Sequence, residues 1–132
     1  MNKNIYWKQV QSFAPSLLRI SIALVFLWFG LNQLLNSSAW LAWLPSWMSS
    51  LSLLPTTIIL LNGLFETVLG LLLLMGFLVR PVALLLSLHL FGIVFSIGYN
   101  DIAVRDVGLA LATFVVFLQG DDFWCLSRVI KK

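Results

Sequence analysis

The chain has 132 residues, of which 61% are hydrophobic and only 10% are charged. A soluble domain of this size cannot bury so much apolar surface, so the composition excludes a water-soluble globule and predicts an all-α integral membrane protein in a lipid bilayer. The net charge of +3, with the basic residues near the chain ends, argues against a nucleic-acid partner, and the single cysteine, Cys125, excludes an intrachain disulfide and a cysteine-rich metal site.

The first predicted transmembrane helix covers residues 17–35. The preceding stretch, residues 1–15, mixes two lysines with aromatic residues and is predicted to lie at the lipid headgroups rather than to cross the bilayer. Basic residues before an apolar run that ends in Ser37-Ser38-Ala39 are also typical of a cleaved signal peptide. We expect the segment to be retained as the first span.

The segment after the first span is uncharged and rich in tryptophan. Residues 36–55 contain Trp40, Trp43 and Trp47 together with two prolines and several serines. Indole rings favour the interface between lipid and water, so we expect an interfacial loop or short helix lying flat on the bilayer between the first and second spans.

The second and third spans are predicted at residues 56–78 and 82–99. Pro81 disfavours a helical conformation at Arg80, so Gly76, Arg80 and Pro81 are predicted to form a tight turn. A turn this short makes the two spans antiparallel neighbours.

A polar stretch, residues 99–106, leads into the fourth predicted span at residues 103–119. The chain is therefore predicted to be one domain, residues 1–132, with both termini and the turn at Arg80 on the same side of the membrane. The basic residues on that side are Lys3, Lys8, Arg80, Arg128, Lys131 and Lys132. Because cytoplasmic segments retain basic residues, we predict a multi-pass protein of the cytoplasmic cell membrane with both termini inside.

Ionisable and polar side chains within the predicted spans are candidates for function, because each is costly at bilayer depth unless it is paired or hydrated. Glu66 lies near the middle of the second span, and Asn62 lies one turn away on the same helical face. The third span carries the single histidine, His89. Asn32 and Gln33 lie at the outer end of the first span.

These side chains are predicted to form one inward-facing site beneath the tryptophan-rich segment, in the outer half of the bundle. Glu66 and His89 are the candidate catalytic residues, as proton carriers. Arg105 is expected to pair with Glu66 or with a neighbouring aspartate, because a buried charge left single would be neutralised. The candidate ligand-binding residues are Asn32, Gln33, Asn62, Asn100, Asp101, Arg105 and Asp106.

A purely structural interpretation of the same residues stays open. Interhelical hydrogen bonds commonly hold membrane bundles together, and Gly92 with Ser96 and Gly108 with Ala112 have the spacing of close helix packing. His89 could ligate a metal or be a satisfied donor in the core, but a single histidine cannot supply two axial ligands to haem within one chain. No metal site is predicted.

Several short motifs lie within and between the predicted spans. They are Arg19, Phe29-Gly30-Leu31-Asn32-Gln33-Leu34, Asn62-Gly63-Leu64-Phe65-Glu66, Leu69-Gly70 with Gly76, Arg80-Pro81, His89-Leu90 and Asp101-Ile102-Ala103-Val104-Arg105-Asp106. Over residues 17–119 the sequence resembles the DoxX-like family of small four-helix membrane proteins, relatives of the small subunit of thiosulfate:quinone oxidoreductase. The resemblance implies a cytoplasmic-membrane location and an association with redox or sulfur metabolism. Some four-helix relatives use cysteine pairs, which this chain lacks.

The expected function is an accessory or quinone-interacting subunit of a membrane-associated oxidoreductase. Quinone is the expected ligand, and a soluble or membrane redox protein is the expected partner, because the chain has no flavin, iron–sulfur or dinucleotide motif to supply electrons. The alternative is a non-enzymatic scaffold, small-molecule carrier or sensor. A homo-oligomer is compatible with either function.

Overall fold

The computed structural model describes residues 3–131, and within that range it contains helices and no strands, which confirms the all-α prediction. In chain order the elements are α1 (Lys3–Ser12), α2 (Ala14–Leu35), the 3₁₀ helices η1 (Ser37–Trp43) and η2 (Ser46–Ser50), α3 (Pro55–Met75), α4 (Val79–Ile97), α5 (Asp101–Gln119) and α6 (Leu126–Ile130). Lys132, one of the basic residues assigned above to the cytoplasmic side, lies outside the described residues.

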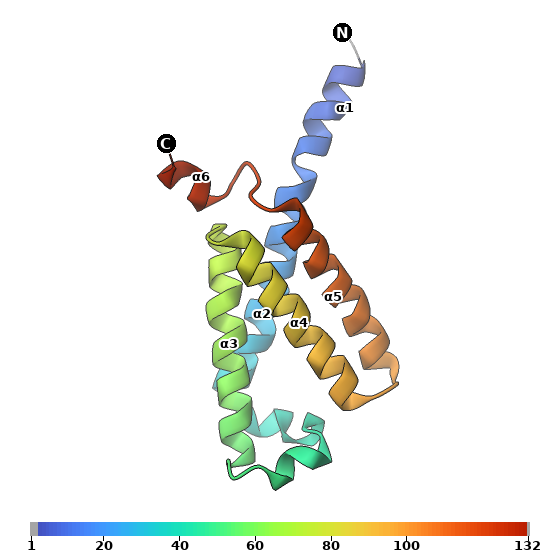
Figure 1. Ribbon diagram of the computed structural model, residues 1–132, viewed down its shortest axis with the longest axis vertical. Helices are drawn as coiled ribbons and strands as arrows, with labels where there is room; N and C mark the ends of the chain where they lie inside the picture. Colours follow the sequence, from blue (N-terminus) through green and yellow to red (C-terminus); the bar gives the residue numbers. More distant parts are fainter. Residues whose placement is uncertain (1–2, 132) are drawn as a thin grey trace.

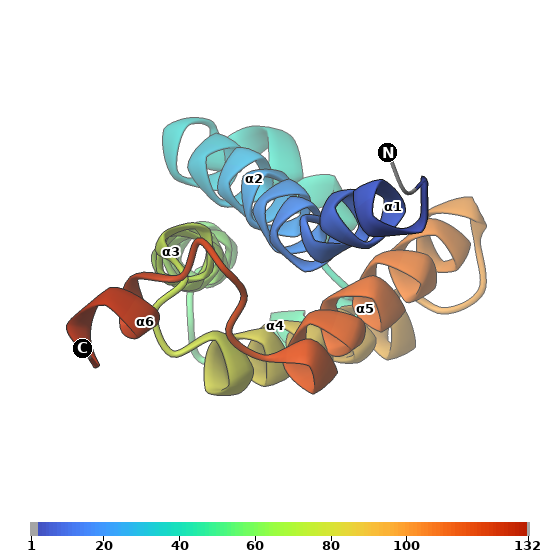
Figure 2. The same ribbon diagram turned by 90° about the horizontal axis from the view of Figure 1, so that it is seen from above.

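The four long helices form two antiparallel pairs, α2 with α3 and α4 with α5 (Figure 1). The pairs meet at the end of the bundle that carries the α3–α4 turn, and they diverge toward the other end. There η1 and η2 run across the opening between them (Figure 1). Seen along the bundle, α5 lies beside α4 on the side away from α3 (Figure 2).

Glycines allow α2 and α3 to approach each other closely. A Cβ atom added to Gly30 would lie 2.7 Å from the backbone nitrogen of Thr67, and one added to Gly63 would lie 2.9 Å from the carbonyl oxygen of Gly30. The sequence spacing also predicted close helix contacts at Gly92 and Gly108. The structure has no such contact at either glycine, because an added Cβ atom would meet nothing within 4 Å. Close packing therefore belongs to the α2–α3 pair.

The core lies where the two helix pairs meet. Its largest buried apolar side chains include Phe26, Leu73, Val79, Leu86 and Val116. The outward faces of the same helices are also apolar, and many of their leucine and phenylalanine side chains are exposed. Exposed apolar faces around an apolar core suit a protein whose solvent is lipid.

Within residues 3–131, three helices are long and apolar enough to cross a membrane: Lys3–Leu35, which joins α1 to α2, and Pro55–Met75 and Val79–Ile97. The helix α5 is not among them, and it carries Asp101, Arg105 and Asp106 within its first six residues. The chain is thus a membrane protein with apolar helices, and the fourth span stays a prediction.

The turn between α3 and α4 differs from the predicted one. Gly76 and Leu78 adopt left-handed backbone conformations, with φ values of 70° and 51°, and form the turn. The helix α4 begins at Val79, so Arg80 and Pro81 lie in its first turn, and the prediction of a turn at these two residues is wrong. Proline is tolerated there because the first backbone N–H groups of a helix have no partner within the helix.

The N-terminal stretch is helical rather than irregular. The helix α1 has no buried residues and projects beyond the bundle, nearly in line with α2 (Figure 1). Pro15 lies in the first turn of α2, so this helix begins at Ala14 and not at residue 17. The interfacial position predicted for residues 1–15 stays a prediction.

Candidate functional site

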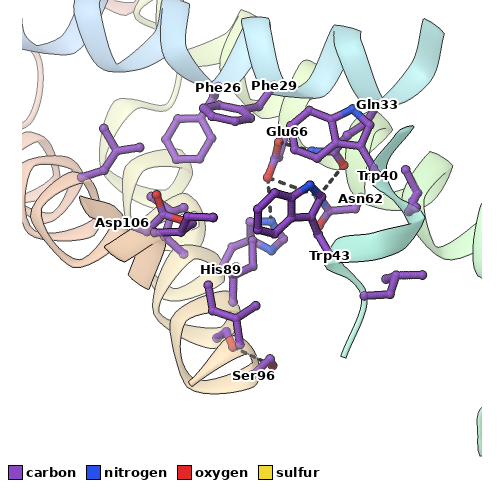
Figure 3. Close-up of a pocket in the computed structure, with 18 of the residues that line it drawn as sticks. Phe26, Phe29, Gln33, Trp40, Trp43, Asn62, Glu66, His89, Ser96 and Asp106 are labelled. Carbon is purple, nitrogen blue, oxygen red and sulfur yellow. Dashed lines mark hydrogen bonds and ion pairs between the residues drawn. The ribbon is translucent and has the colours of Figure 1, made fainter. Parts of the chain in front are cut away.

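A cavity of about 610 Å³ lies between the diverging helix pairs. Its walls come from α2, α3, α4 and α5, and η1 and η2 border it at the open end of the bundle. Most of the wall is apolar, with Phe26, Phe29, Trp40 and Trp43 as its aromatic part (Figure 3). Polar side chains line this apolar space from four helices, so the cavity is the candidate site.

The carboxylate of Glu66 is the centre of the polar wall and is almost completely buried. It accepts a hydrogen bond from Gln33 Nε2 at 3.1 Å and one from Asn62 Nδ2 at 3.2 Å. His89 Nε2 lies 3.1 Å from Glu66 Oε1 (Figure 3). Asn62 Nδ2 also donates to Gln33 Oε1 at 2.7 Å, so the two amides hold each other in place. The carboxylate is therefore stabilised by three side chains from three helices.

Local helix geometry brings these groups together. Asn62 and Glu66 are four residues apart on α3 and so lie on one face of that helix. Gln33 reaches them from α2 because Gly63 has no side chain: a Cβ atom there would lie 2.9 Å from the Cβ of Gln33. The close α2–α3 packing is thus a condition for the hydrogen bond between Gln33 and Glu66.

The ring of His89 lies beside Glu66 in the cavity wall. It packs against the ring of Phe65, with 4.8 Å between ring centroids, and about 20% of its side chain is exposed. In the neutral tautomer that fits an ionised Glu66, the Nε2 atom carries the hydrogen and donates a hydrogen bond to the carboxylate. The Nδ1 atom is then an acceptor, and no described residue donates to it.

Arg105 and Asp106 form the second polar part of the wall, on α5. Both Arg105 Nε and Nη2 lie 2.9 Å from Asp106 Oδ1, and the guanidinium lies 5.6 Å from the centroid of the Phe29 ring. Among the partners expected for Arg105, the structure therefore selects Asp106. Figure 3 shows Asp106 on one side of Glu66 and the tryptophans Trp40 and Trp43 on the other.

Three of the predicted ligand-binding residues lie outside the cavity wall. Asn32 donates to the carbonyl oxygen of Trp28 on its own helix, at 2.7 Å. Asn100 is the N-cap of α5, since its side chain accepts a hydrogen bond from the backbone N–H of Ala103. Asp101 is exposed in the first turn of α5. The wall does include Gln33, Asn62, Glu66, His89, Arg105 and Asp106.

A second buried polar cluster, which the sequence analysis did not predict, lies at the opposite end of the bundle. Arg19 is 1% exposed, and its Nε atom donates to Asp122 Oδ2 at 2.6 Å. Its Nη1 atom donates to the carbonyl oxygens of Leu73 and Leu74, both at 2.7 Å. Ser16 donates to Asp122 Oδ1 at 2.7 Å. This cluster fastens the chain after α5 to the start of α2 and the end of α3.

The environment of this cluster changes two pKa values. Burial alone would raise the pKa of Asp122, but hydrogen bonds from Arg19, Ser16 and the backbone N–H of Trp124 outweigh it and hold the pKa below the ordinary value of 3.8. Burial raises the pKa of the Cys125 thiol, which also accepts a hydrogen bond from the backbone N–H of Asp122 at 3.2 Å. Cys125 is thus a poor nucleophile.

One signal in the sequence could have indicated the Arg19 cluster. An arginine within an apolar span needs an acidic partner, and the polar residues after α5 are the acids nearest in depth to Arg19. The aromatic residues of the tryptophan-rich segment were assigned to the membrane interface, and in the structure Trp40 and Trp43 also line the cavity.

Among residues 3–131, no group of three or more His, Cys, Asp or Glu side chains could hold a metal ion.

Comparison with known proteins gives one match. The model of the DoxX family matches residues 14–98, which contain α2, η1, η2, α3 and α4 and most of the cavity wall, and it confirms the resemblance seen in the sequence motifs. No curated protein and no solved structure matches the chain.

Proposed function

The chain belongs to the DoxX family of membrane proteins, and we propose that it is a quinone-interacting subunit of a membrane-associated oxidoreductase system. The ligand site is the cavity beside Glu66 and His89. The observation that carries this proposal is a buried carboxylate, surrounded by neutral donors, that faces an apolar cavity with aromatic walls.

The chemistry of a quinone fits such a wall. A quinone headgroup is a flat apolar ring with two carbonyl oxygens, so it needs aromatic surfaces to stack on and a few polar groups at the edge of the ring. Phe26, Phe29, Trp40 and Trp43 supply such surfaces, and the polar groups come from His89 and Arg105. The cavity volume of about 610 Å³ is in the range of small-molecule sites.

The same groups can exchange the protons of the reaction. Reduction of a quinone to a hydroquinone takes up two electrons and two protons. In the reverse direction one hydroquinone O–H would give its proton to His89 Nδ1, with Glu66 holding the Nε2 proton of the ring, and the second O–H would give its proton to the Asp106 carboxylate in the same wall. The electrons pass to or from a redox partner protein, since the chain carries no redox motif of its own.

We also propose that α5 is a fourth span and that both termini are cytoplasmic. The helix α5 has the same length as α4, 19 residues, and packs along it in the antiparallel direction (Figure 1). Two of its three charged residues are paired with each other, which lowers the cost of placing them in a bilayer. Basic residues at the end that carries the α3–α4 turn support the orientation.

A non-enzymatic carrier, scaffold or sensor is the second candidate. One observation favours it: Glu66 already has hydrogen-bonding partners from Gln33, Asn62 and His89, so the bundle is complete without a ligand. In that case the cavity would serve to hold a small molecule or to change shape, and the interaction with other proteins would carry the function.

The test is the quinone content of the gently purified full chain, measured by mass spectrometry, together with titration of a short-chain quinone followed by tryptophan fluorescence. Glu66→Gln removes the charge that orients His89, and we expect it to weaken quinone binding roughly tenfold. Asp101→Asn is the matched control, because it makes the same chemical change outside the cavity. Equal binding by all three proteins, or no quinone in any folded sample, would favour the second candidate.

A further inference from the structure

Basic side chains with no acidic partner among residues 3–131 surround the segment after α5. Arg80 packs against the backbone of Gly120, where a Cβ atom would lie 2.6 Å from the arginine Nε. Arg128 and Lys131 lie at the end of α6. Asp122 is paired with Arg19, and Asp121, which accepts a hydrogen bond from Ser127 at 2.7 Å, is one acid beside the three cations Arg80, Arg128 and Lys131. The region therefore carries an uncompensated positive charge.

The segment that carries these cations is fixed to the bundle. The ion pair between Arg19 and Asp122 holds its start, and the backbone N–H of Ser127 donates to the carbonyl oxygen of Gly76 at 3.3 Å. Cys125 is buried against Gly76, which has a left-handed backbone conformation. A Cβ atom on Gly76 would lie 2.6 Å from the Cys125 Cα, so there is no room for a side chain at this position. The cations of α6 are thus placed beside the α3–α4 turn.

Large apolar side chains alternate with the cations. Phe123 and Trp124 are 66% and 60% exposed, and Val129 and Ile130 on α6 are more than half exposed. The guanidinium of Arg128 lies 5.6 Å from the centroid of the Phe123 ring. The helix α6 lies beside the end of α3 and runs across its direction (Figures 1 and 2). A short segment in which aromatic residues precede a basic, apolar helix, lying across the ends of membrane helices, is typical of the lipid headgroup layer.

We propose that the surface formed by the α3–α4 turn and residues 120–131 binds the phosphate headgroups of anionic phospholipids. Arg80, Arg128 and Lys131 supply the charge, and the exposed aromatic and aliphatic side chains enter the boundary between headgroups and acyl chains. An acidic protein would leave these apolar side chains in water, whereas a lipid surface accepts both kinds of group. This inference is independent of the cavity and of the ligand proposed for it.

The experiment uses the purified full chain in detergent, with phosphatidylglycerol or phosphatidylcholine of identical acyl chains added. Bound lipid is counted by native mass spectrometry, and the rise in melting temperature is measured for each lipid. The test variant is Arg80→Gln with Arg128→Gln. The matched control is Lys3→Gln with Lys8→Gln, which removes the same charge from α1, away from the proposed surface. Inorganic phosphate is added as a competitor.

We expect the wild type and the α1 control to prefer phosphatidylglycerol, and the test variant to bind it about 25-fold more weakly, since each basic residue near an anionic surface contributes about fivefold. Arg128→Gln alone, at an exposed position, serves if the double variant does not fold. Equal losses in the test and control variants would show that net charge alone attracts the lipid, and competition by inorganic phosphate would show a free-phosphate site. Either result would overturn the proposal, as would equal binding of the two lipids.

Discussion

The two buried polar clusters of this protein differ in how their charges are compensated. At the end where the helix pairs meet, Arg19 binds Asp122 and three backbone carbonyl groups beside the apolar core. At the diverging end, the carboxylate of Glu66 has neutral amides and a histidine as partners and lies beside a cavity. The first arrangement is complete in itself, whereas the second leaves room and an unused ring nitrogen for another molecule.

This difference gives a criterion for membrane proteins in which every buried polar residue is a candidate for function. A cation paired with an anion inside closed packing has nothing left to offer a ligand, so Arg19 and Asp122 are expected to act on stability. A carboxylate held by amide and imidazole donors beside a cavity can accept a hydrogen bond from a ligand while its other partners stay in place. Glu66 is thus expected to act on ligand binding more than on folding.

The largest expected effect is on the Arg19 cluster. Arg19→Met leaves Asp122 buried without its cation, and breaking a buried ion pair in this way costs about 3–5 kcal/mol of unfolding free energy. The measurement is denaturant unfolding of the purified chain in detergent. Arg19→Met combined with Asp122→Leu should recover part of the loss, and Glu66→Gln should cost much less. A larger loss for Glu66→Gln than for Arg19→Met would invert the comparison.

A smaller effect is expected where the Glu66 cluster depends on helix packing. Gly63→Ala places a methyl group against Gly30 and Gln33, and overpacking of this kind costs about 1–3 kcal/mol. Because Gln33 must move, ligand binding should weaken together with stability. Gly108→Ala is the control, since its Cβ atom would meet nothing within 4 Å and the residue lies outside the cavity wall. Unchanged ligand binding in a destabilised Gly63→Ala protein would separate the site from the packing.

The smallest effect concerns acidification of the Arg19 cluster. The pKa of Asp122 is lower in the folded protein than its ordinary value of 3.8, so its charge stabilises the fold above that pH, and this contribution is lost as the pH falls through the lower folded-state pKa. Melting temperatures measured from pH 6 to pH 3 should fall more steeply for the wild type than for Asp122→Asn, which has no carboxyl group to titrate there. Parallel curves would contradict this assignment.

The sequence predicted the parts of the site that follow from helical periodicity. Asn62 and Glu66 lie on one face because they are four residues apart, and His89 faces them because the short α3–α4 connection makes the two helices antiparallel neighbours. The family model covers residues 14–98, the range that contains the motifs around Gly30, Gly63 and Gly70. Local rules were sufficient for these features.

Other features depended on choices between competing partners. Asn32 and Asn100 were predicted in the site, but backbone groups close to them in sequence satisfy their side chains instead. The turn was predicted at Pro81 from its effect on the preceding residue, yet the first turn of a helix accepts proline without loss of a hydrogen bond. Pairing of Arg19 with Asp122 joins the first long helix to the tail, which no local pattern indicates.

The distance in sequence between those two partners also bears on biosynthesis. Arg19 and Asp122 are separated by 103 positions, and the ribosome completes Arg19 long before Asp122 exists. The first helix therefore enters the membrane before the counter-ion of Arg19 has been synthesised. A chain truncated before Asp122 would leave Arg19 without its counter-ion.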